Sequence, residues 1–126
     1  MAVYKTVTYT ISNNAEGRRK VEAARDEINR IQGELNSLKI FNLLMTFAGL
    51  FHPVTSIASA CFSGATTSYP DYLEKWEDVF TRAGFDMWKY RPEVSTNISY
   101  VKISYDLIGN AEKYRAGTPR YSYHKN

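Results

Sequence analysis

Apolar and polar residues alternate along three segments of the chain, which is the period of a strand with one buried face. One segment covers residues 3–11 near the N-terminus, and the other two cover residues 97–107 and 119–124. A turn region that contains glycine separates the last two segments. We expect these strands to form one small antiparallel sheet, covered on one face by helices, with the ends of the chain close together.

The period changes to that of an amphipathic helix after the first strand. Asn13 and Asn14 provide helix-capping side chains, and an apolar stripe follows at alternating spacings of three and four residues. The stripe consists of Val21, Ala24, Ile28, Ile31, Leu35 and Leu38. No Gly or Pro separates Leu38 from the apolar run that begins at Ile40. The pattern therefore predicts one long helix over residues 14–51.

Charged residues are missing from a long central segment. Residues 40–70 contain no Asp, Glu, Lys or Arg, whereas the 39 residues before them contain twelve. Pro53 interrupts the apolar run, so we expect a second short helix over residues 54–62 and a helical hairpin with its tip at His52. A segment without charge is typically enclosed by the protein's own core, by a partner or by lipid. The residues that would contact a membrane or a partner are Phe41, Leu44, Phe47, Leu50, Phe51, His52 and Ile57.

A further amphipathic helix is expected over residues 70–83. Pro70 suits its first turn, and Gly84 suits its C-terminal cap. The aromatic-rich residues 85–90 that follow are expected to form a short strand. Trp76, Trp88 and Tyr90 are interpreted as core and rim residues, with an interfacial belt or a sugar-stacking platform as the alternatives.

Composition supports a single folded domain of the α+β class over residues 1–126. The chain is 44% apolar and 23% charged, close to globular averages. Its one cysteine, Cys61, excludes an internal disulfide and is expected to be buried. No apolar signal-peptide core lies within the first 14 residues, so we expect a cytoplasmic protein or one released by a non-classical route.

The C-terminal 14 residues combine cations with aromatic side chains. This candidate basic-aromatic surface consists of Lys113, Arg115, Arg120, Tyr121 and Tyr123. Such a surface can follow an anionic membrane or a nucleic-acid backbone. Four basic residues are a weak signal, so a solvated terminal strand is the simpler interpretation. We expect nucleic acid not to be the partner.

The sequence predicts a non-enzymatic protein that needs neither metal nor cofactor. The two histidines lie 72 positions apart, and no metal, nucleotide or nucleophile motif occurs. No small-molecule substrate is inferred. A Cys61–His52 pair, a carboxylate cluster that begins at Asp71 and a metal-free nuclease centred on His124 are the enzymatic alternatives considered.

The arrangement of a long amphipathic helix leading into an uncharged hairpin resembles the plan of α-helical pore-forming toxins over residues 14–62. This resemblance implies a self-associating, membrane-active protein that inserts the hairpin. The alternative is a homo-oligomeric structural or interaction module whose apolar segment is core or subunit interface. Either function predicts a homo-oligomer, for which the helical stripe supplies the candidate oligomer seam Val21, Ile28, Ile31, Leu35 and Leu38.

Overall fold

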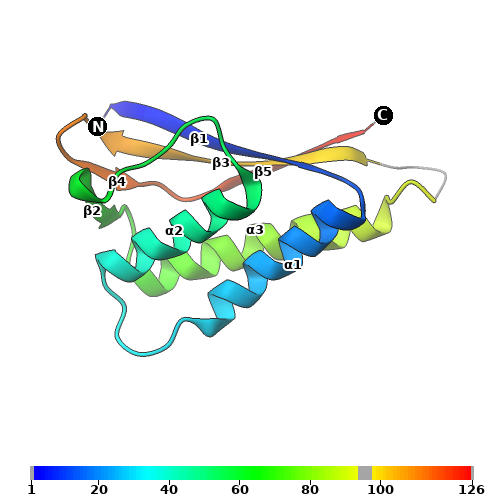
Figure 1. Ribbon diagram of the computed structural model, residues 1–126, viewed down its shortest axis with the longest axis horizontal. Coiled ribbons are helices and arrows are strands. Elements are labelled where there is room, and N and C mark those ends of the chain that lie inside the picture. The colour runs from blue at the N-terminus through cyan, green and yellow to red at the C-terminus, as the bar shows by residue number, and fades with distance from the viewer. Residues whose placement is uncertain (1, 94–97, 126) are drawn as a thin grey trace.

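A computed structural model describes residues 2–93 and 98–125 and shows an α+β fold, as predicted (Figure 1). Within these residues there are three helices, α1 (Ala15–Arg30), α2 (Ser37–Phe51) and α3 (Tyr69–Lys89). There are five strands, β1 (Val3–Ser12), β2 (Phe62–Ala65), β3 (Ile98–Gly109), β4 (Tyr114–Ala116) and β5 (Arg120–Lys125). Position 97, where the sequence analysis starts its second strand, lies outside the described residues.

The five strands form one mixed sheet centred on β3. β1 pairs with one edge of β3, and β4 and β5 pair with successive parts of the other edge, all antiparallel. The expected antiparallel pairing of the N- and C-terminal strands is thus confirmed, and β2 adds a parallel pairing with β4 that was not predicted. Val3 lies opposite Ile108, whereas Lys125 lies opposite Ile98. The termini therefore sit at opposite ends of β3, and the expectation that they are close is wrong (Figure 1).

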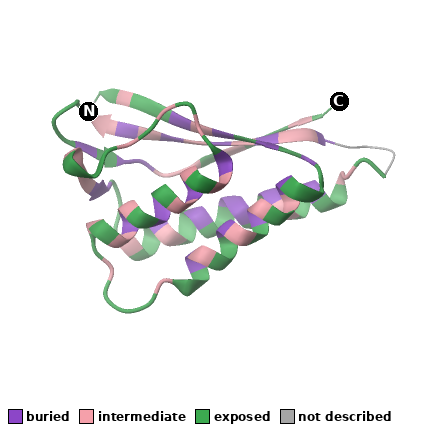
Figure 2. Cartoon of the chain, viewed as in Figure 1, coloured by how far each residue is buried: buried purple, intermediate pink, exposed green. Residues whose placement is uncertain are grey.

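The three helices cover one face of the sheet (Figure 2). An aromatic core fills the space between the two layers. Trp76 is fully buried at its centre. The aromatic rings whose centroids lie within 6.3 Å of that of Trp76 are those of Tyr9, Phe47, Tyr72, Phe80 and Tyr105. Alternate residues of β3, from Val101 to Leu107, close the core from the sheet side. The period of two in the sequence thus identified the buried face of this strand correctly.

The predicted long helix over residues 14–51 is wrong because the chain turns between α1 and α2. Ile31 leaves the helical conformation with φ −66° and ψ 122°, and Gly33 adopts a φ of 78°. The Asn36 side chain then accepts a 2.9 Å hydrogen bond from the Lys39 amide and starts α2. A positive φ costs little for Gly, and Asn is a strong N-cap, so these two residues separate the helices.

The predicted second arm of the hairpin, a helix over residues 54–62, is also wrong. The chain runs from His52 to Ala58 without a helix, then makes one 3₁₀ turn at Ser59–Cys61 and enters β2. Tyr114 fixes this segment with its hydroxyl. That hydroxyl accepts a 2.6 Å bond from the Ala58 amide and donates a 2.5 Å bond to the Ala58 carbonyl. The Ala58 backbone groups are thereby bound to Tyr114 instead of to a helix.

Helix α3 is longer than predicted and includes the segment expected to be a short strand. Gly84 does not end the helix, which continues to Lys89. The added turns bury Met87 completely. A methyl group placed on Gly84 would lie 3.8 Å from Val21 Cγ1, so this glycine sits where α3 faces α1. Gly84 was therefore mistaken for a cap because its position at a helix–helix contact is not visible in the sequence.

Candidate partner-binding groove

The residues predicted to contact a membrane or a partner lie mostly in the protein's own core. Leu44 and Phe47 are fully buried and Phe51 is nearly so. Three others, Phe41, Leu50 and Ile57, are partly buried. His52 is exposed and ends α2 with a φ of 49°. The absence of charge over residues 40–51 is thus matched by burial of one face of α2 inside this chain.

The predicted oligomer seam does not form one continuous stripe. Val21 and Ile28 are buried in the core, and Ile31 packs partly against it at the end of α1. Leu35 is partly buried in the connection between the helices, and Leu38 is 63% exposed in the first turn of α2. The 3-4 spacing indicated an amphipathic helix correctly as far as the turn after α1, where its regular period ends. Cys61, expected to be buried, is half-buried.

The predicted basic-aromatic surface is divided among three parts of the sheet. Lys113 and Arg115 lie at β4, where Arg115 donates a 3.0 Å bond to the Ala65 carbonyl. Arg120 forms a 2.9 Å ion pair with Asp106, and its hydrogen bonds hold the pKa of that carboxyl below its usual value.

The two tyrosines of that set face α3. Tyr121 donates a 2.8 Å hydrogen bond to Asp86, and burial raises the pKa of its hydroxyl. Tyr123 stacks on Tyr90 at the end of α3, with ring centroids 6.4 Å apart. Each ring also has a cation beside it, since the Arg82 guanidinium lies 5.3 Å from the Tyr121 centroid and the Lys125 ammonium lies 5.8 Å from the Tyr123 centroid.

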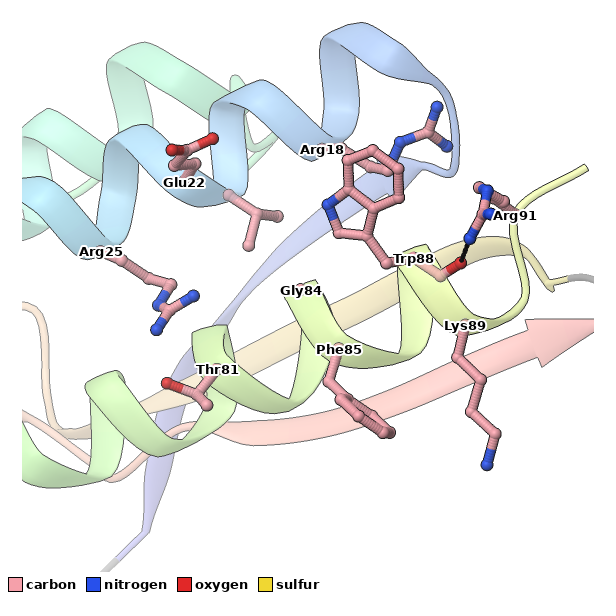
Figure 3. A pocket seen from close by; sticks show the side chains of 10 residues that line it. Arg18, Glu22, Arg25, Thr81, Gly84, Phe85, Trp88, Lys89 and Arg91 are labelled. Carbon is pink, nitrogen blue, oxygen red and sulfur yellow. Dashed lines mark hydrogen bonds between the residues drawn. The ribbon is translucent and has the colours of Figure 1, made fainter.

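A groove of about 850 Å³ runs between the outer sides of α1 and α3 (Figure 3). Its floor is formed by Val21 of α1 and Gly84 of α3, where the two helices face each other. Trp88 and Phe85 line the groove and are 58% and 66% exposed. Four cations also line the groove, namely Arg18, Arg25, Lys89 and Arg91. One acid, Glu22, accompanies them.

Trp88 organises the cations at one end of the groove. The guanidinium carbon of Arg18 lies 5.2 Å from the indole centroid, and that of Arg91 lies 5.4 Å from it. Arg91 also donates a 2.7 Å hydrogen bond to the Trp88 carbonyl. Figure 3 shows the indole leaning towards α1, whereas Phe85 and Lys89 point away from α1 and line the far edge of the groove. The Lys89 ammonium lies 5.8 Å from the Phe85 ring centroid.

The groove cations are only weakly neutralised by the protein. Among the described residues, Arg91 has one ion pair, a 3.8 Å contact with Glu93, and no ion pair involves Arg18, Arg25 or Lys89. Arg18 donates a 3.1 Å hydrogen bond to the side chain of Asn13, which is neutral. A groove with two exposed aromatic rings and four cations can accept a ligand that is both apolar and anionic.

The sequence analysis missed this groove because its residues come from two helices about 60 positions apart. Trp88 was the available signal, and it was interpreted as a core or rim residue. Its spacing from Gly84 places both residues on the groove side of α3 only once residues 85–89 are recognised as helical, and Arg91 follows directly after that helix. The assignment of these residues to a strand hid that relationship.

Residues 2–93 and 98–125 contain neither a metal-binding cluster nor a membrane-spanning helix. No group of three or more His, Cys, Asp or Glu side chains there is placed to hold a metal ion. In the same part of the chain, every helix is too short or too polar to cross a membrane.

Comparison with known proteins found no matching family model, no matching curated protein and no matching solved structure.

Proposed function

We propose that this protein is a non-enzymatic interaction module that binds an acidic protein segment in the groove between α1 and α3. The observation that supports this proposal is the exposure of Trp88 and Phe85 among four groove cations. Aromatic residues and Arg are enriched at the centres of protein interfaces. Large apolar side chains left in water beside them favour association with a partner, because burying them removes apolar surface from solvent.

The shape of the groove favours a helical protein segment over a nucleic acid. Two helices side by side form a shallow channel, and a third helix can lay an apolar face along it. Gly84 keeps the floor low because it has no side chain. Two guanidinium groups already lie by the Trp88 ring, which leaves it less available for stacking on a base. The charge of the groove then selects an acidic segment.

Membrane activity, the other function predicted from the sequence, would require a different state of the chain. The apolar residues that would insert include Leu44 and Phe47, which are fully buried here. Releasing them would expose apolar surface to water, which costs about 25 cal/mol of free energy per Å². Leakage of dye from anionic and neutral liposomes tests this function, and His52→Asp should reduce any leakage strongly while leaving the melting temperature nearly unchanged.

A synthetic peptide tests the groove directly. The probe is a fluorescent, helical, Glu-rich peptide with one phenylalanine, unrelated in sequence to this chain, titrated with the protein at low and high salt. We expect saturable binding that weakens with salt and is lost in Trp88→Ala. Glu112→Lys, an exposed change in the turn before β4, serves as a control that should bind normally.

Two results would overturn the proposal. The first is a peptide that binds Trp88→Ala as well as it binds the wild type. The second is single-stranded DNA that binds more tightly than the peptide and loses this affinity in Trp88→Ala, which would assign the groove to nucleic acid.

A further inference from the structure

The outward side of α3 divides into an acidic half and a basic half. Residues 69–80 contain four acidic residues and one basic residue, whereas residues 81–91 contain three basic residues and one acidic residue. The acidic residues are Asp71, Glu74, Glu77 and Asp78, and all four are exposed. The single acid of the second half, Asp86, is half-buried and accepts the hydrogen bond from Tyr121. The helix therefore presents opposite charges at its two ends.

The helix dipole explains only part of this division. An acid in the first turn and a base in the last turn stabilise a helix, but the effect falls off within those turns. It therefore accounts for Asp71 and Lys89. Glu77 and Asp78 lie more than two turns from the N-terminus, where the dipole has little influence. Their position needs a second explanation.

Acidic residues on one side of Thr81 are matched in spacing by aromatic residues on the other side. Glu74 and Trp88 lie seven residues to either side of it, and Glu77 and Phe85 lie four residues to either side. Spacings of four and seven residues keep side chains on one face of a helix. All five residues are exposed. If a second α3 lies antiparallel across this face, with a twofold axis at Thr81, each acidic half meets the basic-aromatic half of the other.

We infer that the partner of the groove is a second copy of this chain, which docks the acidic half of its own α3 between α1 and α3. This inference rests on the proposed function and names its acidic segment. Glu74 of each copy then lies at the other copy's Trp88 and Lys89, and Glu77 lies at Phe85. Arg18 and Arg25 of α1 supply further positive charge along the same groove. A self-complementary patch of this kind produces a closed twofold dimer.

The geometry also explains the exposed aromatic rings. In the isolated chain, Phe85 and Trp88 remain largely in water. In an antiparallel pair, the aromatic rings of each copy pack on the aliphatic parts of the acidic side chains of the other copy. Because of the twofold axis, each contact between an aromatic ring and an acidic side chain occurs twice in one dimer. The surface thus buries four large aromatic side chains, which are the residue types that carry most interface energy.

Charge reversal provides a decisive test because the two halves of α3 can be changed separately. The basic variant carries Glu74→Lys and Glu77→Lys, and the acidic variant carries Lys89→Glu and Arg91→Glu. Each variant alone places like charges opposite each other at both ends of the pair. Mixed together, the two variants place opposite charges at both ends. We therefore expect each variant to be a monomer and the equal mixture to form heterodimers.

Light scattering after size-exclusion chromatography measures the result. The wild type should show twice the monomer mass of 14.4 kDa at micromolar concentration, and more dissociation at high salt. The control variant Glu112→Lys with Lys113→Glu changes two exposed charges at the turn before β4 and should remain dimeric. Recovery of dimers in the mixture shows in the same experiment that both variants are folded.

The possible results separate self-association through the groove from binding of an acidic peptide in it. A wild type that stays monomeric at all concentrations but binds the acidic peptide overturns the inference and leaves the proposed function standing. A mixture that remains monomeric although the wild type is dimeric overturns the antiparallel arrangement. A dimer that persists in both variants and in Trp88→Ala places the subunit contact elsewhere and contradicts the inference.

Discussion

Trp76 and Trp88 lie twelve residues apart on the same helix and have opposite surroundings. Trp76 is fully buried among five aromatic rings, whereas Trp88 is 58% exposed beside two guanidinium groups. Twelve residues rotate the helix by about 120° beyond whole turns at 3.6 residues per turn. The difference shows that residue type alone does not decide whether a tryptophan serves stability or recognition. The face of the helix decides it.

The largest effect is expected from exchanging each tryptophan for alanine. Trp76→Ala should lower the free energy of unfolding by about 3–5 kcal/mol, because it leaves a cavity in the aromatic core. Trp88→Ala should change it by less than about 0.5 kcal/mol, since exposed positions contribute little. Urea titrations followed by circular dichroism measure both values. Equal losses of stability in the two variants would contradict the assignment of Trp88 to a binding surface.

A second contrast separates the tyrosines of the core from those at the surface. Burial raises the pKa of Tyr9, Tyr72 and Tyr105 in the folded protein. The pKa of a tyrosine hydroxyl in the unfolded chain is about 10. Below that pH the buried hydroxyls contribute their full stability, and above it the unfolded chain ionises first, so the free energy of unfolding falls. Each such group costs up to about 1.4 kcal/mol per pH unit in that window.

Alkaline titration of the melting temperature checks this expectation. The temperature should fall steeply above pH 10, and Tyr72→Phe should make the fall shallower because one titrating group is removed. Val54→Ala, an exposed change after α2, is the control and should leave the slope unchanged. A melting temperature that is constant from pH 9 to 12 would contradict the burial of these hydroxyls.

A smaller effect is expected at the floor of the groove. Gly84→Ala should raise the free energy of unfolding by about 0.5–1 kcal/mol, because alanine is the better helix former. The added methyl group would meet only Val21 Cγ1 at 3.8 Å and an Arg25 nitrogen at 3.9 Å, both ordinary contacts. Thermal melting of the variant measures the gain. A loss of stability would mean that α1 and α3 pack more closely than described.

The smallest effect concerns a surface cation that already has a partner. Arg120 lowers the pKa of Asp106, so their contact contributes stability above the unfolded carboxyl pKa and loses it as pH falls through the lowered folded value. Arg120→Gln should return the Asp106 pKa towards its ordinary value, as carboxyl NMR shifts would report. The cost in stability should be below about 1 kcal/mol, as for other exposed pairs. An unchanged Asp106 pKa would refute this pairing.

The sequence predicted well where local period and burial agree. Alternation identified β1 and most of β3, and the 3-4 stripe of α1 correctly placed Val21 and Ile28 on the inward face. The sequence-based prediction failed where a contact with a distant residue determines the backbone conformation. The hydroxyl of Tyr114 keeps Ala58 out of a helix, and these residues lie 56 positions apart. Gly33 and Asn36 were visible signals of a turn, but the apolar run beyond them was given more weight.

The groove could not be predicted in the same way. Its residues share no local pattern, because Arg18 and Trp88 become neighbours only when α1 and α3 pack antiparallel. The charge division along α3, by contrast, is present in the sequence. The acidic residues were interpreted only as a carboxylate cluster that begins at Asp71, because the predicted helix ended at residue 83, before its basic and aromatic half.

The central place of β3 has a consequence for how the chain is made. Its neighbour β1 is synthesised about 100 residues before it, because Val3 pairs with Ile108. At about 5–20 residues per second, β1 must wait roughly 5–20 seconds on the ribosome before its partner exists. Throughout that interval the alternating apolar face of β1 has no sheet to join. The apolar face of β1 is therefore open to non-native contacts until β3 has been translated.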